Sequence, residues 1–199
     1  MQAVMRGARR LSQWGLWFGG ALVLLAAILI GIDVVLRKLF NASIGGADEL
    51  AGYALAIGTA WSLAAALLER AHIRIDSLYV LLPNRLRLGL DFAGLAVFIA
   101  FFGLIAWHGS RMVMQSWTSG SRSQSALQTP TVIPQSIWIL GLAVFVVIGA
   151  LLFLHALVLL GRGRVADATG AISTRSAEED VAAEIRDLKD RQARDAAAP

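Results

Sequence analysis

Three histidines are the residues of this 199-residue chain that most readily suggest a cofactor. A b-type haem site needs two imidazoles that face each other at one depth of a helical membrane bundle. His108 lies near one boundary of an apolar stretch, His155 lies near the opposite boundary of another, and His72 lies beyond the end of a third. They form no matched pair, and their spacing fits no zinc site. We therefore expect no cofactor and no metal. A haem-bearing or haem-free membrane-anchor subunit of a redox enzyme is the alternative interpretation.

Carboxylates close to apolar stretches are the second group that could do chemistry. Asp33 lies inside the first stretch, and ionisable residues at membrane depth mark either ion pathways or buried pairs. Arg37 follows one helical turn later, so an i, i+4 ion pair explains Asp33, and a coupling-ion role is the less favoured alternative. Asp48 and Glu49 open the second stretch, where the helix dipole favours acidic side chains. Both could also contact an external partner.

Enzyme chemistry is not indicated by the remaining residue patterns. The chain has no cysteine, which removes thiolate catalysis and disulfides. It contains no glycine-rich phosphate loop and no Ser/His/Asp grouping within a known motif. We predict that the protein is not an enzyme. A stand-alone carrier is a further alternative, against which the lack of two similar halves with broken helices argues.

Four long apolar stretches must position these residues. They cover Trp14–Leu36, Leu50–Leu68, Leu88–Trp107 and Ile137–Leu160, and about 20 apolar residues in a helix match a hydrocarbon core of ~30 Å. Hydrophobic residues make up 57% of the chain, and the mean hydropathy is +0.64. The stretches do not alternate with period two, as strands of a membrane barrel would. We predict an all-α integral membrane protein in which residues 14–160 form a domain of four transmembrane helices.

Shorter segments flank these spans. Met1–Gln13 has apolar and basic residues on opposite helix faces, so we predict an amphipathic N-terminal arm in the headgroup plane; a frayed basic terminus fits equally well. Leu78–Leu82 is predicted to form a short interfacial helix. The polar connection Gly109–Gln135 is the longest, and exposed loops of this kind commonly carry recognition. Residues 161–199 are predicted to form a polar cytoplasmic tail.

The distribution of basic residues predicts the orientation in the membrane. One side would hold Arg6, Arg9, Arg10, Arg70, Arg74, Arg85, Arg87, Arg162 and Arg164, and the other only Arg37, Lys38, Arg111 and Arg122. The positive-inside rule then places both termini and the middle loop in the cytoplasm. Because the basic residues lie beside span ends, the formal charge of +4 does not indicate nucleic-acid binding.

Small residues recur at every fourth position of the second span, at Gly52, Ala56, Ala60 and Ala64. In lipid, helices associate where small side chains let their backbones approach closely. We interpret these residues as a packing face whose partner is either another span or another chain. An alanine-rich composition without a packing role is the alternative.

The residues that flank the spans resemble a known family, the DctQ-like small permease subunits of tripartite ATP-independent periplasmic (TRAP) transporters. The matching positions are Arg37, Asp48, Glu49, Leu50, Arg70, His72, Arg74, Asp76, Leu82, Pro83, Thr129, Pro130, Ile133 and Pro134. The resemblance covers about residues 10–160, and its most specific part is the stretch from Arg70 to Asp76. Independently of the family, Arg70 and Arg74 lie one helical turn apart at a span end, which favours structural anchoring to anionic headgroups over a direct transport role.

The resemblance implies partners for this chain. In such systems a periplasmic substrate-binding protein delivers an organic anion, often a carboxylate, to a large many-span permease subunit that holds the substrate and sodium sites. The small subunit is implied to act as a scaffold for the large one and to contribute to docking of the binding protein. The resemblance further implies a multi-pass protein of the bacterial inner membrane that takes part in symport.

Overall fold

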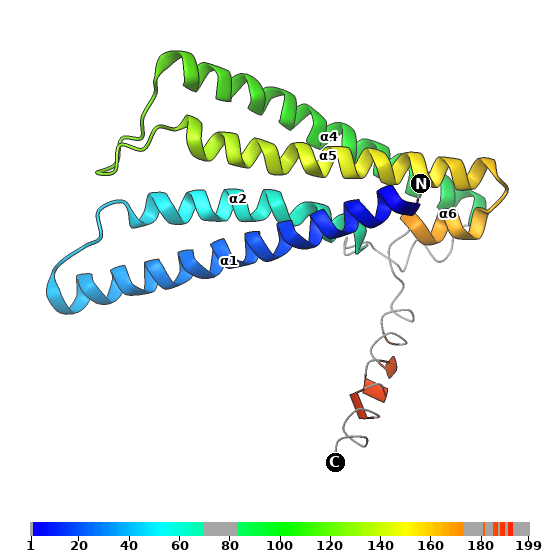
Figure 1. Cartoon of the computed structure of the whole chain (residues 1–199), viewed down its shortest axis with the longest axis horizontal. Helices are drawn as coiled ribbons and strands as arrows, with labels where there is room; N and C mark the ends of the chain where they lie inside the picture. The colour runs from blue at the N-terminus through cyan, green and yellow to red at the C-terminus, as the bar shows by residue number, and fades with distance from the viewer. Residues whose placement is uncertain are drawn as a thin grey trace.

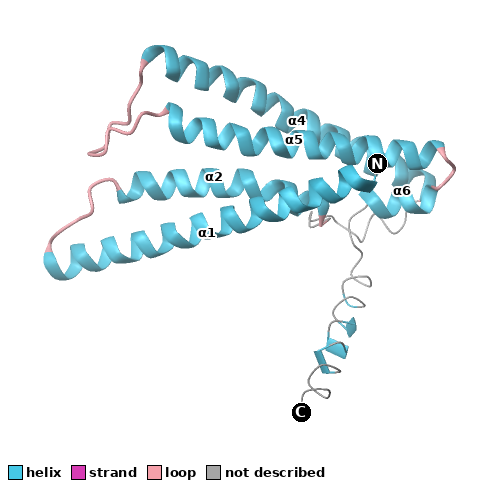
Figure 2. Cartoon of the chain, viewed as in Figure 1, coloured by secondary structure: helices cyan, strands magenta, loops and turns pink. Residues whose placement is uncertain are grey.

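The computed structural model describes residues 2–69 and 83–172, together with 181, 185–186, 188–189 and 191–192. The helices in the two long ranges are α1 (Gln2–Phe40), α2 (Ala47–Leu68), α4 (Asn84–Ser119), α5 (Val132–Gly161) and α6 (Val165–Ile172). Figure 2 shows that loops are confined to the connections between them.

Four of these helices are long and apolar enough to cross a membrane: Ala3–Phe40, Ala47–Leu68, Leu86–Ser119 and Val132–Gly161. Each contains one of the apolar stretches recognised in the sequence. The prediction of an all-α protein with four transmembrane helices is therefore confirmed. The described helices α1 and α4 are 39 and 36 residues long, and at ~1.5 Å per residue both exceed a hydrocarbon core of ~30 Å.

The four spans form a row rather than a closed bundle. Helix α1 packs on α2, α2 packs on α5, and α5 packs on α4, whereas α1 touches α5 only slightly. Figure 1 shows that the outer helices α1 and α4 diverge toward the ends that hold residues 41–46 and 120–131, whereas α2 and α5 run side by side. We call the end with these two connections the loop end, and the opposite end, which holds the start of α1 and α6, the α6 end.

Glycines set the close approach of α1 and α2. A Cβ atom on Gly19 would lie 2.5 Å from the carbonyl oxygen of Gly58, and one on Gly15 would lie 2.6 Å from the carbonyl oxygen of Trp61. Backbones this close need residues without side chains. These glycines were not among the residues predicted to pack.

Trp61 joins three helices near the middle of the row. Its indole Nε1 donates a hydrogen bond to the carbonyl oxygen of Ile137 in α5, at 3.0 Å. Gly141 leaves room for the indole, because a Cβ there would lie 2.6 Å from Trp61 Cδ1. Phe18 of α1 meets the same ring edge-on, with centroids 5.5 Å apart. Within lipid, one hydrogen bond and two close packing contacts thus fix the position of α2 relative to both neighbours.

The apolar core lies between α5 and its neighbours. Phe145 is completely buried, and its ring meets Phe98 and Phe102 of α4 at centroid distances of 5.5 and 4.9 Å. Leu142 and Ile148 are buried one turn to either side. Aromatic rings in such edge contacts add to the packing energy of the α4–α5 pair.

Helix α1 has no break between the predicted N-terminal arm and the first span. Residues 2–13 form its first turns, and the position of the arm Met1–Gln13 in the headgroup plane stays a prediction. Ala8 and Ser12 in this region are buried, with 7% and 3% of their surfaces exposed. These first turns therefore pack within the row of helices.

Helix α4 extends beyond the predicted third span and shortens the following loop. The helix reaches Ser119, so the connection is residues 120–131 instead of Gly109–Gln135. Ser110 and Thr118 donate hydrogen bonds to carbonyls of their own helix at 2.7 and 3.1 Å, which lets polar residues continue the helix. Gly120, with φ of 60°, ends it.

Helix α6 begins the segment that we predicted as a polar tail. Gly163, with φ of 75°, turns the chain after α5, and Ala168 is completely buried as α6 packs on α5 and α4. Arg164 and Asp167 form an ion pair of 2.6 Å at its first turn. The spacing of Val165, Ala168 and Ile172 was the signal in the sequence that could have revealed this helix.

Candidate functional site

Asp33 stabilises the connection between α1 and α2 at the loop end. Only 2% of its side chain is exposed, and its Oδ2 lies 2.6 Å from Arg37 Nη2. Its Oδ1 accepts hydrogen bonds from the backbone N–H of Ile44 at 2.6 Å and from the hydroxyl of Ser43 at 3.0 Å. The expected pair with Arg37 is present. The two loop donors were missed, because ten or eleven residues separate them from Asp33.

This geometry leaves Asp33 little capacity to bind a transported ion. One oxygen is engaged by a guanidinium and the other by two loop donors, so a cation would have to displace interactions that hold the loop. Arg37 also reaches Asp48 at 3.5 Å, but 81% of the Asp48 side chain is exposed. That second pair is screened by solvent and contributes little.

Glu49 stabilises the connection between α4 and α5, residues 120–131, at the same end. Its Oε2 accepts hydrogen bonds from the hydroxyls of Ser123, at 2.9 Å, and of Ser125. Ser123 is itself fixed by Thr129, whose N–H donates to the Ser123 hydroxyl at 3.0 Å and whose carbonyl accepts from the Ser123 N–H at 2.9 Å. One carboxylate of α2 thus determines where residues 120–131 lie.

The two connections also pack directly against each other. Gly46 has φ of 92°, and a Cβ there would overlap the side chain of Leu127. A Cβ on Gly45 would lie 3.2 Å from that of Ala126. Both glycines therefore permit a close contact between residues 41–46 and 120–131, and the loop end forms one connected surface.

Eight of the resemblance positions lie at this end: Arg37, Asp48, Glu49, Leu50, Thr129, Pro130, Ile133 and Pro134. Arg37 and Glu49 hold the loops as described. Pro130 forms an isolated bridge with Arg122 and accepts a hydrogen bond from the N–H of Ile133 at 3.1 Å. Pro134 is buried in the first turn of α5, where the helix needs no N–H donor.

Of the other six resemblance positions, Pro83 alone lies among the described residues. Pro83 precedes α4 in an extended conformation, and its carbonyl accepts hydrogen bonds from the N–H groups of Leu86 and Arg87 at 2.9 and 3.1 Å. Arg70, His72, Arg74 and Asp76 lie outside the described residues, as does the predicted interfacial helix Leu78–Leu82.

The predicted packing face on α2 is divided between the inside and the outside of the chain. Ala60 and Ala64 are buried, with 2% and 1% exposed. Gly52 and Ala56 are exposed, and Ala56 lies in an apolar groove of about 410 Å³ that Trp138 also lines. A partner at the exposed half stays a prediction.

The two described histidines lie far apart. Gly109, the neighbour of His108, lies against Ile139 of α5, and His155 comes sixteen positions later on that helix. At ~1.5 Å per residue the two imidazoles differ in depth by roughly 24 Å, which is too far for one haem. Among the described residues no group of three or more His, Cys, Asp or Glu side chains could hold a metal ion.

Comparison with known families identifies one match. Residues 26–159 match the family model described as "Tripartite ATP-independent periplasmic transporters, DctQ component". The chain belongs to the DctQ family. It is therefore the small permease component of a TRAP transporter and a multi-pass membrane protein. No curated relative and no solved structure matches it.

The DctQ match runs from the middle of α1 to the last turns of α5. It includes both connections at the loop end and the stretch from Arg70 to Asp76, and it excludes the first turns of α1 and all of α6. Membership implies partnership with a large permease and a periplasmic binding protein, and it implies a transporter component rather than an enzyme.

Proposed function

We propose that this DctQ subunit is a scaffold for the large permease subunit of a TRAP-type uptake system. It also contributes to docking of the periplasmic substrate-binding protein. The system imports an organic anion, for which we expect a carboxylate because that is the usual substrate class of the family. The subunit lies in the bacterial inner membrane with both termini in the cytoplasm, as the asymmetry of its basic residues indicates.

The environment of Asp33 is the observation that carries this proposal. A carboxylate available within the apolar spans would suggest a coupling-ion site in this subunit. Asp33 lies inside an apolar stretch, but Arg37, Ser43 and Ile44 already engage both of its oxygens. Ion and substrate binding are therefore assigned to the large permease.

The exposed faces of the row support the scaffold role. In the most apolar window of each span, the buried share is only 17% for α1, 39% for α2, 6% for α4 and 33% for α5. Such spans can be covered on both faces of the row by lipid or by another membrane protein. The close contacts around Gly19, Gly58 and Trp61 hold α1, α2 and α5 together, so the subunit offers a large permease a preformed surface.

The loop end supports the docking role. Asp33 and Glu49 fix the two connections, and Gly46 lets them pack together. A binding protein would then meet a surface whose backbone is already ordered, which lowers the entropy cost of association.

The exposed half of the small-residue face offers a test of the scaffold role. Ala56→Leu is expected to lower the yield of co-purified large permease, because the added side chain forces the partner backbone away. Ala60→Leu should instead destabilise the subunit itself by about 1–3 kcal/mol, since Ala60 is already buried. Ala93→Leu, at an exposed alanine of α4, is the matched control. Normal co-purification of Ala56→Leu would remove this face from the interface.

Transport by purified components completes the test. Proteoliposomes with this chain alone should take up no organic anion, whereas those with both permease subunits and the binding protein should. Uptake by the isolated chain would contradict the scaffold role and favour a stand-alone carrier.

A further inference from the structure

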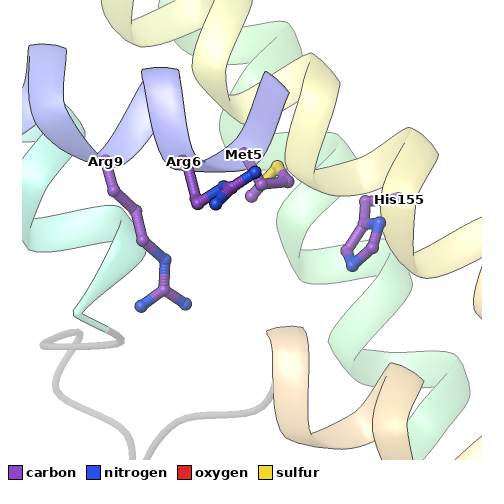
Figure 3. Close-up of a pocket in the computed structure, with 4 residues that line it drawn as sticks. All are labelled: Met5, Arg6, Arg9 and His155. Atoms are coloured by element: carbon purple, nitrogen blue, oxygen red, sulfur yellow. The ribbon is translucent and has the colours of Figure 1, made fainter. Parts of the chain in front are cut away.

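A cationic cavity lies between the start of α1 and the last turns of α5. It has a volume of about 320 Å³ and is lined by Met5, Arg6, Arg9 and His155. Figure 3 shows Arg6 and Arg9 extending from successive turns of α1 on one side of the helix, and the imidazole of His155 facing the same region from α5. This cavity lies at the α6 end, away from the two connections of the loop end.

The polar groups that line this cavity have no ion-pair or side-chain hydrogen-bond partner among the described residues. Neither Arg6 nor Arg9 forms an ion pair with any residue in the described part of the chain, unlike Arg37 and Arg164. The Nδ1 atom of His155 is buried and has no hydrogen-bond partner there. Two guanidinium groups that have no ion pair among the described residues, beside the imidazole of His155, point to an anion from outside the chain.

The chemistry of the lining selects an anion with several oxygen acceptors. Each guanidinium presents five N–H donors in a planar fork that matches phosphate or carboxylate oxygens. Arg6 and Arg9 are three residues apart, so both can reach one group from a single helix face. His155 adds a third side chain from a different helix.

The position of the cavity along α1 favours a lipid phosphate. Trp14 and Trp17 have 76% and 78% of their surfaces uncovered by the chain, and tryptophans of this kind mark the membrane interface. Arg9 precedes Trp14 by five residues, or about 7.5 Å along the helix. The guanidinium groups therefore lie at the level where headgroup phosphates are found.

An apolar groove on the same pair of helices favours a lipid over a free anion. The groove has a volume of about 380 Å³, no polar surface, and walls that include Gly7 and Leu11 of α1. On α5 its walls include Val144, Ile148 and Leu151, and His155 continues their stripe at helical spacing. The groove can hold an acyl chain whose headgroup lies in the cavity.

We propose that the α1–α5 seam binds an anionic phospholipid of the leaflet at the α6 end. Arg6, Arg9 and His155 contact the phosphate, and one acyl chain occupies the groove beside Gly7. The lipid links the first turns of α1 to α5, two helices that otherwise touch only slightly.

Lipid binding at this site can be measured by the thermal unfolding midpoint of the purified full-length chain in detergent. A ligand that binds only the folded state raises the unfolding midpoint, so added phosphatidylglycerol should raise it more than phosphatidylcholine. The double variant Arg6→Gln/Arg9→Gln should bind phosphatidylglycerol about thirtyfold more weakly, given roughly five- to sixfold per arginine at a membrane surface. Arg10→Gln is the matched control, because Arg10 lies on the same helix but does not line the cavity.

Two further arms separate the lipid from other anions. Gly7→Leu fills the apolar groove without meeting any atom within 4 Å of its Cβ, and it should abolish the difference between the midpoints in phosphatidylglycerol and in phosphatidylcholine. Inorganic phosphate alone should stabilise the protein far less than phosphatidylglycerol.

Three results would overturn the proposal. Equal stabilisation by inorganic phosphate would identify a free-anion site. An equal loss in Arg10→Gln would show unspecific attraction between a basic helix and an anionic surface. No preference for phosphatidylglycerol in the unmodified chain would show that the cavity binds no anionic lipid.

Discussion

The loop end and the α6 end of this subunit use their charged residues differently. At the loop end, Asp33 binds Arg37 and two loop donors, and Glu49 binds two serines of the opposite connection. At the α6 end, Arg6 and Arg9 have no ion-pair partner among the described residues. The first set of charges orders the chain itself, whereas the second is available to groups outside the chain.

The difference shows how charged residues that bind external ligands can be distinguished from charged residues that only stabilise the fold of a membrane subunit. A carboxylate inside an apolar span suggests ion transport until its partners are identified. The neighbours of Asp33 account for its charge and its buried oxygens, so its presence needs no transported ion. Charges that remain unpaired after the fold is known are the better indicators of external ligands or partners.

The two ends should lie on opposite sides of the membrane, which gives an all-or-none prediction. The chain has no cysteine, so Ser119→Cys and Ala166→Cys each introduce a single thiol at an exposed position. An impermeant thiol reagent should label Ser119→Cys in intact cells and Ala166→Cys only after permeabilisation. Labelling of Ala166→Cys in intact cells would show the opposite orientation.

Loss of the Asp33 carboxylate should cause the largest fall in stability at the loop end. Asp33→Ala leaves Arg37 and the Ile44 N–H without their buried partner, and a donor left unpaired costs more than the bond it had formed. We expect the thermal unfolding midpoint in detergent to fall several times further than in Asp48→Ala, whose side chain is 81% exposed. Equal midpoints for the two variants would show that the contacts of Asp33 do not contribute to the stability of the subunit.

Loss of the Glu49 carboxylate should have a smaller and local effect. Glu49→Ala frees the hydroxyls of Ser123 and Ser125, so residues 120–131 open more often and their amides exchange about tenfold faster with deuterium. Amides of α6 at the other end should keep their rates, and Asp48→Ala is the matched control. Unchanged exchange at Ser123 and Thr131 would show that the loop holds its position without Glu49.

The sequence predicted the features that depend on neighbouring residues. The four spans follow from hydropathy alone, and the pair of Asp33 with Arg37 follows from i, i+4 spacing. The DctQ resemblance, based on residues beside the span ends, was confirmed by the family comparison. Such signals are local, so they can be recognised before the packing of the helices is known.

The missed features depend on contacts between distant residues. Glu49 meets Ser123 and Ser125 across 74 and 76 positions, and no local pattern links these residues. The small-residue pattern on α2 did not indicate that Gly58 is the close contact with α1, because several alanines and glycines have similar spacing. The arrangement of the helices in a row could likewise not be inferred from hydropathy, because lipid covers apolar faces as well as another helix does.

The ion dependence of uptake by complexes that contain Asp33→Asn most directly tests whether the loop-end charges are structural. Asparagine keeps an oxygen for Ser43 and Ile44 but removes the charge that pairs with Arg37. We predict a lower yield of assembled complex together with an unchanged dependence of transport on sodium and on pH. A shifted sodium or proton dependence in fully assembled complexes would contradict this and show that the small subunit takes part in coupling.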